Sequence, residues 1–294
     1  GGARIRARPP KGGGVSGRPP LSPMLRAVRH AVLLAGTAIM LAPFALMIAT
    51  SFKPKEEIFL PEFHLLPQRW AGLDNYREAF TQVPLLHFLL NGAIVTIAIF
   101  ALQVLVNVPA AYALAKLRFR GRTTLFGAVL VCLLIPYQAT ALPIYLLFYL
   151  LGLLDTYAAL VLPFTISVFG IFLMRQFFLG VPDDLVDAAR IDGMSEYGIV
   201  WSVMAPAAIP ALVAFGIFSV VAHWNDYFWP LIAVGNQGLY TPPLGIAHLK
   251  LNGEGTAYGP LMAAATIVIA PLVLAFLVAQ RRFVEGITFT GLKG

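Results

Sequence analysis

The chain carries little charge. Of its 294 residues, 12% are Asp, Glu, Lys or Arg, and 59% are hydrophobic. Soluble domains normally have about a quarter of their residues charged. So few charged side chains cannot cover a surface that faces water, so most of this surface must face lipid. The composition therefore excludes an ordinary soluble protein and predicts an integral membrane protein.

The chain also lacks the usual motifs of chemistry. Cys132 is its single cysteine, so an intramolecular disulfide and a thiolate metal cluster are both excluded, and we interpret Cys132 as a small hydrophobe within a membrane helix. The five histidines form no H-E-x-x-H, and neither G-x-x-x-x-G-K-[ST] nor G-x-S-x-G occurs. We therefore expect no metal, no cofactor, no ATP site and no enzymatic activity in this chain. Any energy it uses must come from a partner.

Long apolar stretches are what the sequence has in abundance. A helix needs about 20 apolar residues to cross a bilayer. Six stretches qualify, and their approximate ranges are 26–50, 88–114, 124–150, 157–178, 207–231 and 258–280. The predicted fold is an all-α integral membrane protein with six transmembrane helices.

The net charge of +7 follows the predicted topology. Arginines and lysines gather in four places, which lie on one side of a six-span chain: the N-terminus, the loop 116–122, the positions near 175–190, and the C-terminus. Cytoplasmic loops carry such an excess. Both termini are therefore expected in the cytoplasm, and nucleic-acid binding is not needed to explain the charge.

Two domains are predicted. Residues 1–23 are rich in Gly, Pro and Arg and have no apolar period, so they are expected to form a disordered basic tail. Residues 24–294 form the transmembrane domain. Its first apolar stretch is too long for a cleaved signal and is interpreted as an anchor that stays.

The longest predicted connection between spans covers about 51–87. Its frequent prolines exclude one continuous helix, and Leu73–Phe80 is expected to form a short helix at the membrane surface. Either an interfacial clamp or a landing surface for an external protein fits this segment, and both readings stay open.

A short acidic insert at about 182–206 separates two apolar stretches. Asp183 is a preferred N-cap and predicts the start of a helix there, while Gly193 predicts a chain reversal because glycine adopts positive φ readily. Ser195 is expected to cap a second helix, which Pro206 ends. The insert therefore predicts a helix-turn-helix of the kind that docks onto a partner.

In each helix of the insert, residues spaced three or four positions apart are expected to share one face. The first face has small side chains, which allow close approach, and comprises Leu185, Ala188, Ala189 and Asp192. The second comprises Tyr197, Val200, Trp201 and Met204. Interfacial membrane helices are usually basic on their polar face. Because this insert is acidic, a protein partner is favoured over a lipid surface.

The insert resembles the coupling loop of ATP-binding-cassette importer permeases. That family's pattern is Glu-Ala-Ala, three residues, Gly, nine residues, Ile, one residue, Leu-Pro. Here Asp187-Ala188-Ala189, Gly193, Val203 and Ala205-Pro206 match every spacing. Asp187 replaces glutamate, Val203 replaces isoleucine and Ala205 replaces leucine, and each change keeps the charge or the apolar character.

The resemblance covers nearly the whole chain after Met24. The runs 172–178, 224–226, 280–286 and 292–294 look like maltose-type carbohydrate permeases, within the binding-protein-dependent (MetI-like) permeases, and 175–193 is also similar to glycerol-3-phosphate permeases. It implies a multi-pass permease in a bacterial or archaeal cytoplasmic (inner) membrane. The implied partners are a second homologous permease, two copies of a cytoplasmic ATPase and an external solute-binding protein.

By this resemblance the coupling residues are Asp187, Ala188, Ala189, Asp192, Gly193 and Pro206. They would seat in a cleft of the ATPase and move as a rigid lever, and the tail 286–294 would contact the ATPases as well. The implied cargo is a sugar or related polyol, and a glycerol-3-phosphate or phosphodiester cargo is the alternative. An amino-acid or peptide permease shares the same loop and stays open.

Polar residues within two apolar stretches are candidates for the substrate path. The candidates are Tyr137, Gln138, Trp224, Asn225 and Asp226. Pro136 and Pro143 predict kinks beside the first two. Packing between helices explains Gln138 as well, and capping explains Asp226. A distant alternative is a membrane enzyme in which His223 and Asp226, three residues apart, act as an acid–base pair on one helix face.

Overall fold

The computed structural model describes residues 22–60, 62, 64–252 and 257–291. The described residues form helices and no strand, as the composition predicts. The elements are α1 (Pro23–Ser51), α2 (Lys55–Ile58), α3 (Gly72–Thr81), α4 (Leu85–Lys116), α5 (Arg122–Cys132), α6 (Tyr137–Leu150), α7 (Tyr157–Val161), η1 (Leu162–Phe164), α8 (Val168–Gly180), α9 (Asp183–Ile191), α10 (Glu196–Ile199), η2 (Val200–Met204), α11 (Ala205–Ala207), α12 (Ile209–Trp224), α13 (Phe228–Ala233), η3 (Gln237–Leu239), α14 (Pro242–Asn252) and α15 (Tyr258–Gly291).

The predicted spans are of two kinds, single long helices and bent pairs of shorter helices. Three helices, α1, α4 and α15, are each long and apolar enough to cross a membrane. Three pairs pass the same test together but are bent: α5 with α6 by 100°, α7–η1 with α8 by 41°, and α10–α11 with α12 by 81°. Six spans result when each bent pair counts as one, which agrees with the six apolar stretches.

Local chemistry explains two of these bends. Pro136 has an extended backbone (φ −66°, ψ 131°) directly before α6, so α5 ends at Cys132 and the kink expected at Pro136 is confirmed. Pro143 lies within α6, which runs through it unbroken. Before α8, Ser167 adopts an extended backbone and its hydroxyl accepts a hydrogen bond from the amide of Gly170 (3.0 Å). A new helix therefore begins at that point.

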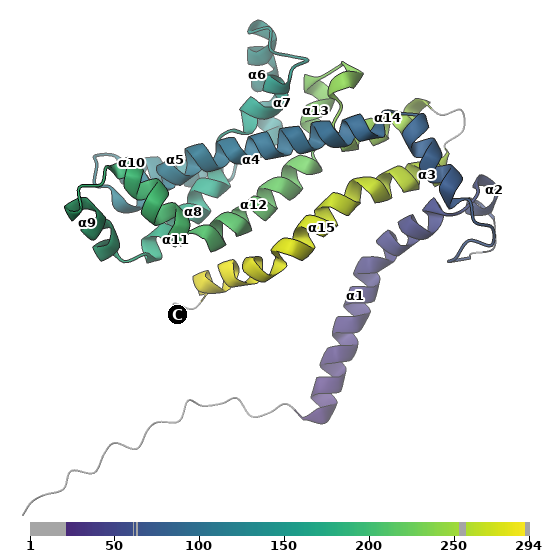
Figure 1. Cartoon of the computed structure of the whole chain (residues 1–294), viewed down its shortest axis with the longest axis horizontal. Coiled ribbons are helices and arrows are strands. Elements are labelled where there is room, and N and C mark those ends of the chain that lie inside the picture. Colours follow the sequence, from purple (N-terminus) through teal and green to yellow (C-terminus); the bar gives the residue numbers. More distant parts are fainter. Residues whose placement is uncertain (1–21, 61, 63, 253–256, 292–294) are drawn as a thin grey trace, which may run out of the picture. The chain divides into compact units, whose positions relative to one another are not determined.

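Helix α4 is central to the packing of residues 47–291. It packs against α8 and α12, and α12 packs in turn against α15 (Figure 1). Buried residues form three clusters, and α4 contributes to each: Tyr112 to the first, Ile99 to the second and Phe88 to the third. Small residues allow these close contacts: a Cβ on Gly170 of α8 would lie 2.8 Å from Nδ2 of Asn107 in α4.

The chain divides into two compact units, Gly1–Leu46 and Met47–Gly294. In the first unit the helix α1 begins at Pro23, and its side chains are exposed over most of its apolar length. The basic tail predicted at 1–23 lies outside the described residues as far as residue 21. The second unit contains the remaining helices, and the backbone of α15 continues as helix to Gly291.

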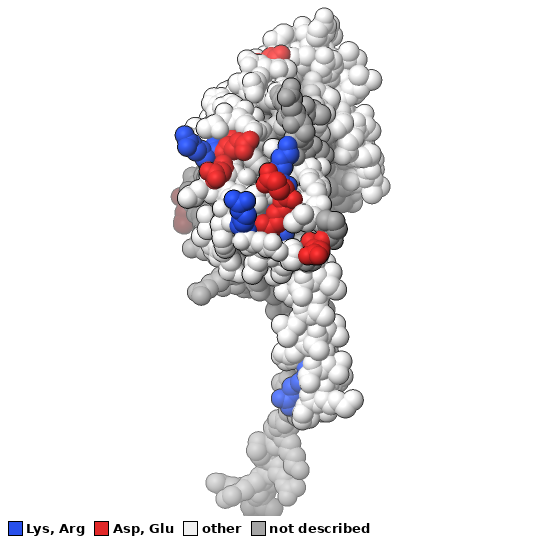
Figure 2. Space-filling model, turned by 90° about the vertical axis from the view of Figure 1, so that its right-hand side faces the viewer, with Lys and Arg blue, Asp and Glu red and all other residues white. Residues whose placement is uncertain are grey.

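The connection between α1 and α4 contains the short helix predicted at Leu73–Phe80, which the structure extends to α3. Figure 2 shows acidic and basic side chains gathered over α2, α3 and the loop between them. Large apolar side chains are exposed in the same segment, notably Trp70 and Leu73. The segment therefore combines a charged surface with exposed apolar groups.

Buried polar groups fix this connection. The carboxylate of Glu57 accepts hydrogen bonds from the amides of Gln68 (2.8 Å) and Arg69 (3.3 Å). The bond from the Gln68 amide is the main cause that lowers the pKa of Glu57 below its usual 4.5. The side-chain amide of Asn75 in α3 donates to the carbonyl of Ser51 (2.9 Å). The first two bonds tie α2 to the loop before α3, and the third ties α3 to the end of α1.

Candidate functional site

The acidic insert folds as the predicted helix-turn-helix. Helix α9 ends at Ile191, and Gly193 has φ +80°, so the chain reverses in the left-handed conformation that glycine favours. The amide of Gly193 donates to the carbonyl of Arg190 (3.0 Å), and that of Met194 to the carbonyl of Ala189 (3.0 Å). This pair of bonds is a Schellman motif. We call residues 183–204 the hairpin.

The two helix starts of the hairpin differ from each other. Ser195 caps α10 as predicted, because its hydroxyl accepts a hydrogen bond from the amide of Gly198 (3.2 Å). Helix α9 begins at Asp183 as predicted, but the capping role predicted for Asp183 is wrong: Pro182 takes the N-cap position, and Asp183 lies inside the first turn. The Asp183 carboxylate pairs instead with the ammonium group of Lys116 at the end of α4. A tertiary ion pair has replaced the local cap.

The predicted face of α9 is divided between core and surface. Val186 and Ala189 are buried in the first cluster, whereas Leu185, Ala188 and Asp192 are exposed. The buried stripe therefore lies one residue away from the predicted face. Val186 supplies the larger side chain for the core, so Ala188 is left facing outward.

The second predicted face is divided in the same way. Val200 and Met204 are buried, while Tyr197 and Trp201 are exposed. Residues 200–204 form a turn of π-helix, which shifts the side-chain register between these pairs. The helix does not stop at Pro206 as predicted; it continues to Ala207 and bends after it.

The hairpin exposes apolar side chains outside the six apolar stretches. Ile191 is 86% exposed and Tyr197 75% exposed, and Leu185 and Ala188 are also at the surface. The acidic residues Asp187 and Asp192 lie among them, also exposed. The outer surface of the hairpin thus combines apolar contacts with negative charge, which is typical of a surface that binds another protein.

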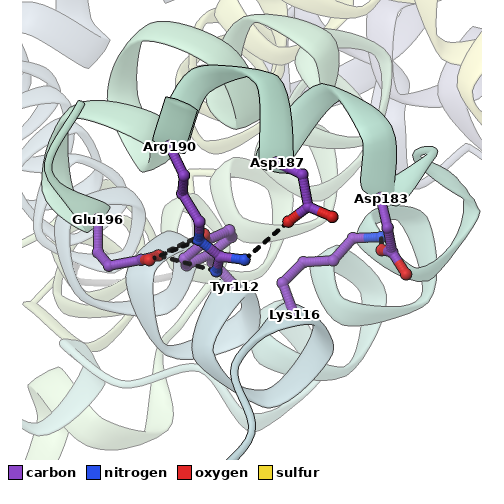
Figure 3. Close-up of polar contacts among 6 residues, drawn as sticks. All are labelled: Tyr112, Lys116, Asp183, Asp187, Arg190 and Glu196. Atoms are coloured by element: carbon purple, nitrogen blue, oxygen red, sulfur yellow. Dashed lines mark hydrogen bonds and ion pairs between the residues drawn. The ribbon is translucent and has the colours of Figure 1, made fainter. Parts of the chain in front are cut away.

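Arg190 connects the parts of the hairpin. Its guanidinium forms two contacts with Glu196, Nε to Oε1 at 2.9 Å and Nη2 to Oε2 at 3.4 Å, and a third with Asp187, Nη1 to Oδ1 at 3.1 Å (Figure 3). The hydrogen bond from Arg190 is the main cause that lowers the pKa of Glu196, with a second contribution from Tyr112. The two helices are thereby held together by one side chain.

Two residues of α4 connect the hairpin to the membrane helices. The hydroxyl of Tyr112, which is 1% exposed, donates to Oε2 of Glu196 (2.5 Å). Lys116 pairs with Asp183 and also donates to the carbonyl of Val181 (2.6 Å). This pairing with Lys116 lowers the pKa of Asp183. Figure 3 shows both side chains of α4 pointing toward the hairpin.

Three of the predicted path residues line one cavity. It has a volume of about 530 Å³, and Tyr137, Asn225 and Asp226 are among its walls. Its other walls are Phe164, Ala222, His223, Tyr227 and Phe228. Gln138 is exposed and is not among them. Trp224 is buried elsewhere, where its indole N–H donates to the carbonyl of Val268 (3.0 Å).

The proposed acid–base pair does not share a helix face. Helix α12 ends at Trp224, so His223 lies in its last turn and Asp226 beyond it. Oδ1 of Asp226 accepts hydrogen bonds from the amides of Phe228 (3.1 Å) and Trp229 (3.4 Å), at the start of α13. The expected structural capping by Asp226 is therefore present, although the same side chain also faces the cavity.

Sequence reasoning missed the residues that hold both regions in place. Arg190, Glu196 and Tyr112 were not candidates, and neither was Gln103, a buried side chain of α4 that bonds to His223. The available signal for Gln103 was an amide within an apolar stretch, since polar groups there need partners. No sequence signal links Tyr112 to Glu196, because 84 positions separate them.

Comparison with known proteins decides the family. Residues 107–288 match the family described as binding-protein-dependent transport system inner membrane component. The chain belongs to this family. The match includes the hairpin and the cavity, so both are features of an importer permease of the inner membrane. The resemblance noted from the hairpin sequence is confirmed.

Individual relatives agree with this assignment. The arabinooligosaccharides transport system permease protein AraQ of Halalkalibacterium halodurans is 36% identical over 254 residues, which cover 86% of this chain and 91% of AraQ. The sn-glycerol-3-phosphate transport system permease protein UgpE of Escherichia coli O1:K1 is 31% identical over 272 residues, covering 90% and 96%. The chain is therefore a permease subunit of a binding-protein-dependent importer.

A solved structure shows the same fold. A chain of a bacterial ABC transporter involved in the import of the acidic polysaccharide alginate superposes with a TM-score of 0.80 at 24% identity, covering 90% of this permease and 100% of that chain. An importer of this class works with a substrate-binding protein and an ATPase, and the permease family is not itself catalytic. The membrane-enzyme alternative has no support.

Proposed function

We propose that the hairpin of this permease docks into a separate cytoplasmic ATPase and transmits its movement to the membrane helices. ATP hydrolysis then takes place in two copies of that ATPase. A second, homologous permease and an external solute-binding protein complete the importer. The coupling residues are Asp187, Ala188, Ala189, Asp192, Gly193 and Pro206.

One observation carries this proposal. The hairpin exposes Ile191 and Tyr197 on one side, while Lys116 and Tyr112 of α4 hold its other side. Because one side of the hairpin is exposed to a partner and the other is bonded to α4, movement of a bound partner can be transmitted to α4. Among the six coupling residues, Ala189 supports the hairpin from inside, because it is buried; Ala188 is the position available to a partner.

The proposed cargo is a sugar or related polyol. Its support is the resemblance to maltose-type permeases together with the similarity to AraQ. A glycerol-3-phosphate or phosphodiester cargo is the alternative, and the similarity to UgpE favours it. Tyr137, Gln138, Trp224, Asn225 and Asp226 stay the proposed path residues. Of these, Tyr137, Asn225 and Asp226 have the stronger case, because they line the cavity.

Site-specific photocrosslinking tests the docking. A photoreactive residue at Ile191 should form an adduct with the importer's ATPase subunit, identified by mass spectrometry, and its yield should change when ATP is added. Leu73 is the matched control, because it is also highly exposed but lies in α3. An ATPase adduct from position 73, or none from position 191 in an active importer, would contradict the proposed docking.

A further inference from the structure

A chain of buried polar side chains lies behind the cavity. Gln103 in α4 and Ser219 in α12 are 3% and 5% exposed. The hydroxyl of Ser219 donates to Oε1 of Gln103 (2.6 Å). Nε2 of Gln103 donates to the carbonyl of Phe164 (2.8 Å) and lies 3.2 Å from Nε2 of His223. This series of hydrogen bonds therefore ends at His223, a residue of the cavity wall.

The positions of the protons follow from this arrangement. A backbone carbonyl only accepts hydrogen bonds, so the Gln103 atom that faces Phe164 must be the amide nitrogen. That nitrogen has two hydrogens, and the second points to Nε2 of His223. Because an amide nitrogen cannot accept, Nε2 of His223 must be unprotonated. The imidazole is therefore neutral, and its proton is on Nδ1.

His223 consequently offers a hydrogen-bond donor to the cavity. Its Nε2 is occupied by Gln103, and Nδ1–H has no hydrogen-bond partner among the residues that the structure describes. The ring of Phe164 lies 4.8 Å from the imidazole, centroid to centroid, and limits its rotation. Gln103 thus fixes both the orientation and the protonation of His223.

Asp226 offers a matching acceptor. Its Oδ1 is used by the amides of Phe228 and Trp229 and by the hydroxyl of Tyr137 (3.3 Å). Its Oδ2 has no partner in the described part of the chain. His223 and Asp226 both line the cavity, so its wall includes one donor and one acceptor for the hydroxyls of a polyol.

The other walls of the cavity indicate which solutes fit. Tyr137, Phe164 and Phe228 give it aromatic faces, and Tyr137 lies edge-on to the other two. Aromatic rings stack on the apolar face of a sugar ring. The described residues that line the cavity include no lysine or arginine. A phosphate entering it would meet the carboxylate of Asp226 with no cation to offset the repulsion.

We propose that this cavity binds an uncharged polyhydroxylated solute, whose hydroxyls bond to Nδ1–H of His223 and to Oδ2 of Asp226. Gln103 is the positioning residue for His223. This inference rests on the proposed importer function and narrows its cargo class. It excludes a phosphate-bearing cargo from this site.

Nitrogen NMR of the reconstituted importer with ¹⁵N-labelled histidine tests the proton positions. The signal of His223, assigned by its loss in His223→Asn, should be that of a neutral ring protonated on Nδ1. In Gln103→Glu a carboxylate faces Nε2, so the proton should move to Nε2. In Ser219→Ala the amide keeps its other partners, so the signal should stay. A wild-type signal protonated on Nε2, or a Gln103→Glu signal identical to wild type, overturns the positioning role.

Titration of the same sample tests the cargo class. Arabinotriose should shift the His223 signal, and glycerol-3-phosphate at the same concentration should not. A shift with glycerol-3-phosphate alone overturns the cargo class, and no shift with either overturns the site. Uptake of arabinotriose should fall roughly threefold to tenfold in His223→Phe, which keeps a ring but loses the hydrogen bond to the solute. Unchanged uptake would also count against the site.

A separate measurement distinguishes a failure of the proposed ATPase docking from a failure of the proposed cargo site. Crosslinking of the ATPase at position 191 is repeated on each variant. Absence of the ATPase adduct from the wild-type importer refutes the proposed coupling. A normal adduct, together with a His223 signal that no solute shifts, refutes the cargo site alone.

Discussion

The contact between Tyr112 and Glu196 should determine how firmly the hairpin is held. In Glu196→Ala the buried hydroxyl of Tyr112 loses its acceptor, and an unsatisfied buried polar group costs about 1–3 kcal/mol. In Glu196→Gln an acceptor oxygen remains and the charge is lost. The ion pair with Arg190 is half exposed, with 37% and 45% of the two side chains accessible, so its loss costs at most about 1 kcal/mol.

Hydrogen exchange in the hairpin measures this difference. The amides of residues 193–199 should exchange about tenfold faster or more in Glu196→Ala and only a few times faster in Glu196→Gln, because about 1.4 kcal/mol corresponds to a factor of ten. ATP-driven uptake per ATP hydrolysed should fall in the same order. Membrane insertion should be unchanged.

Tyr112→Phe provides the control for this reasoning. Once the hydroxyl is absent, Glu196→Ala leaves no orphaned group, so the double variant should exchange more slowly than the sum of the single effects implies. Strictly additive effects of the two substitutions, or equal effects of Ala and Gln at position 196, would refute the assigned role of the buried hydroxyl.

Three further predictions concern the hairpin. Gly193→Ala should lower the free energy of unfolding of the hairpin by about 1 kcal/mol, because a Cβ is strained at a φ of +80° even though open space surrounds it. Gly193→Pro also loses the amide donor and should abolish the crosslink at position 191. Equal crosslinking in both variants would contradict this. Ala188→Glu should prevent docking without a change in thermal stability, whereas the buried Ala189→Glu should lower the melting temperature of the permease as well; identical melting temperatures would show that both positions face outward. The pKa of Glu196 is lower in the folded state than its usual 4.5, so the ionised carboxylate stabilises the hairpin above that pH, and this effect is lost as the pH falls through the folded value. Hydrogen exchange in the hairpin, corrected for the intrinsic exchange rate, should therefore be constant from about pH 8 to 5 and rise below pH 5. A rise already at about pH 6 would point to another group.

The sequence was sufficient for the fold class and for the hairpin. Long apolar stretches and few charges specify membrane helices, and Gly193 marks the reversal because glycine, without a Cβ, adopts positive φ readily. The bends were only partly predictable. Pro136 ends α5, whereas Pro143, an identical signal, lies inside a continuous helix. Neighbouring helices decide between these outcomes, and a single sequence does not contain them.

The faces of the hairpin show the limit of periodicity. Alanines at 188 and 189 are equivalent to a pattern, so the position of the buried stripe depended on Val186 and on the shape of the surface beneath it. Asp183 was assigned to a local cap because its tertiary partner, Lys116, is far away in sequence. Long-range ion pairs of this kind decide the role of a charged residue after the chain has folded.

Helix α4 joins the two functional regions of this permease physically. It holds the hairpin through Tyr112 and supports the cavity through Gln103, nine positions earlier, which is about 14 Å along a helix. Because one continuous helix connects them, a displacement of the hairpin that tilts α4 must also shift the support of His223. We therefore infer that Glu196→Ala, which loosens the hairpin end, reduces the ATP-dependent change in the His223 NMR signal and leaves the nucleotide-free signal unaltered. An ATP response that is undiminished in this variant would mean that the cavity is driven through another helix.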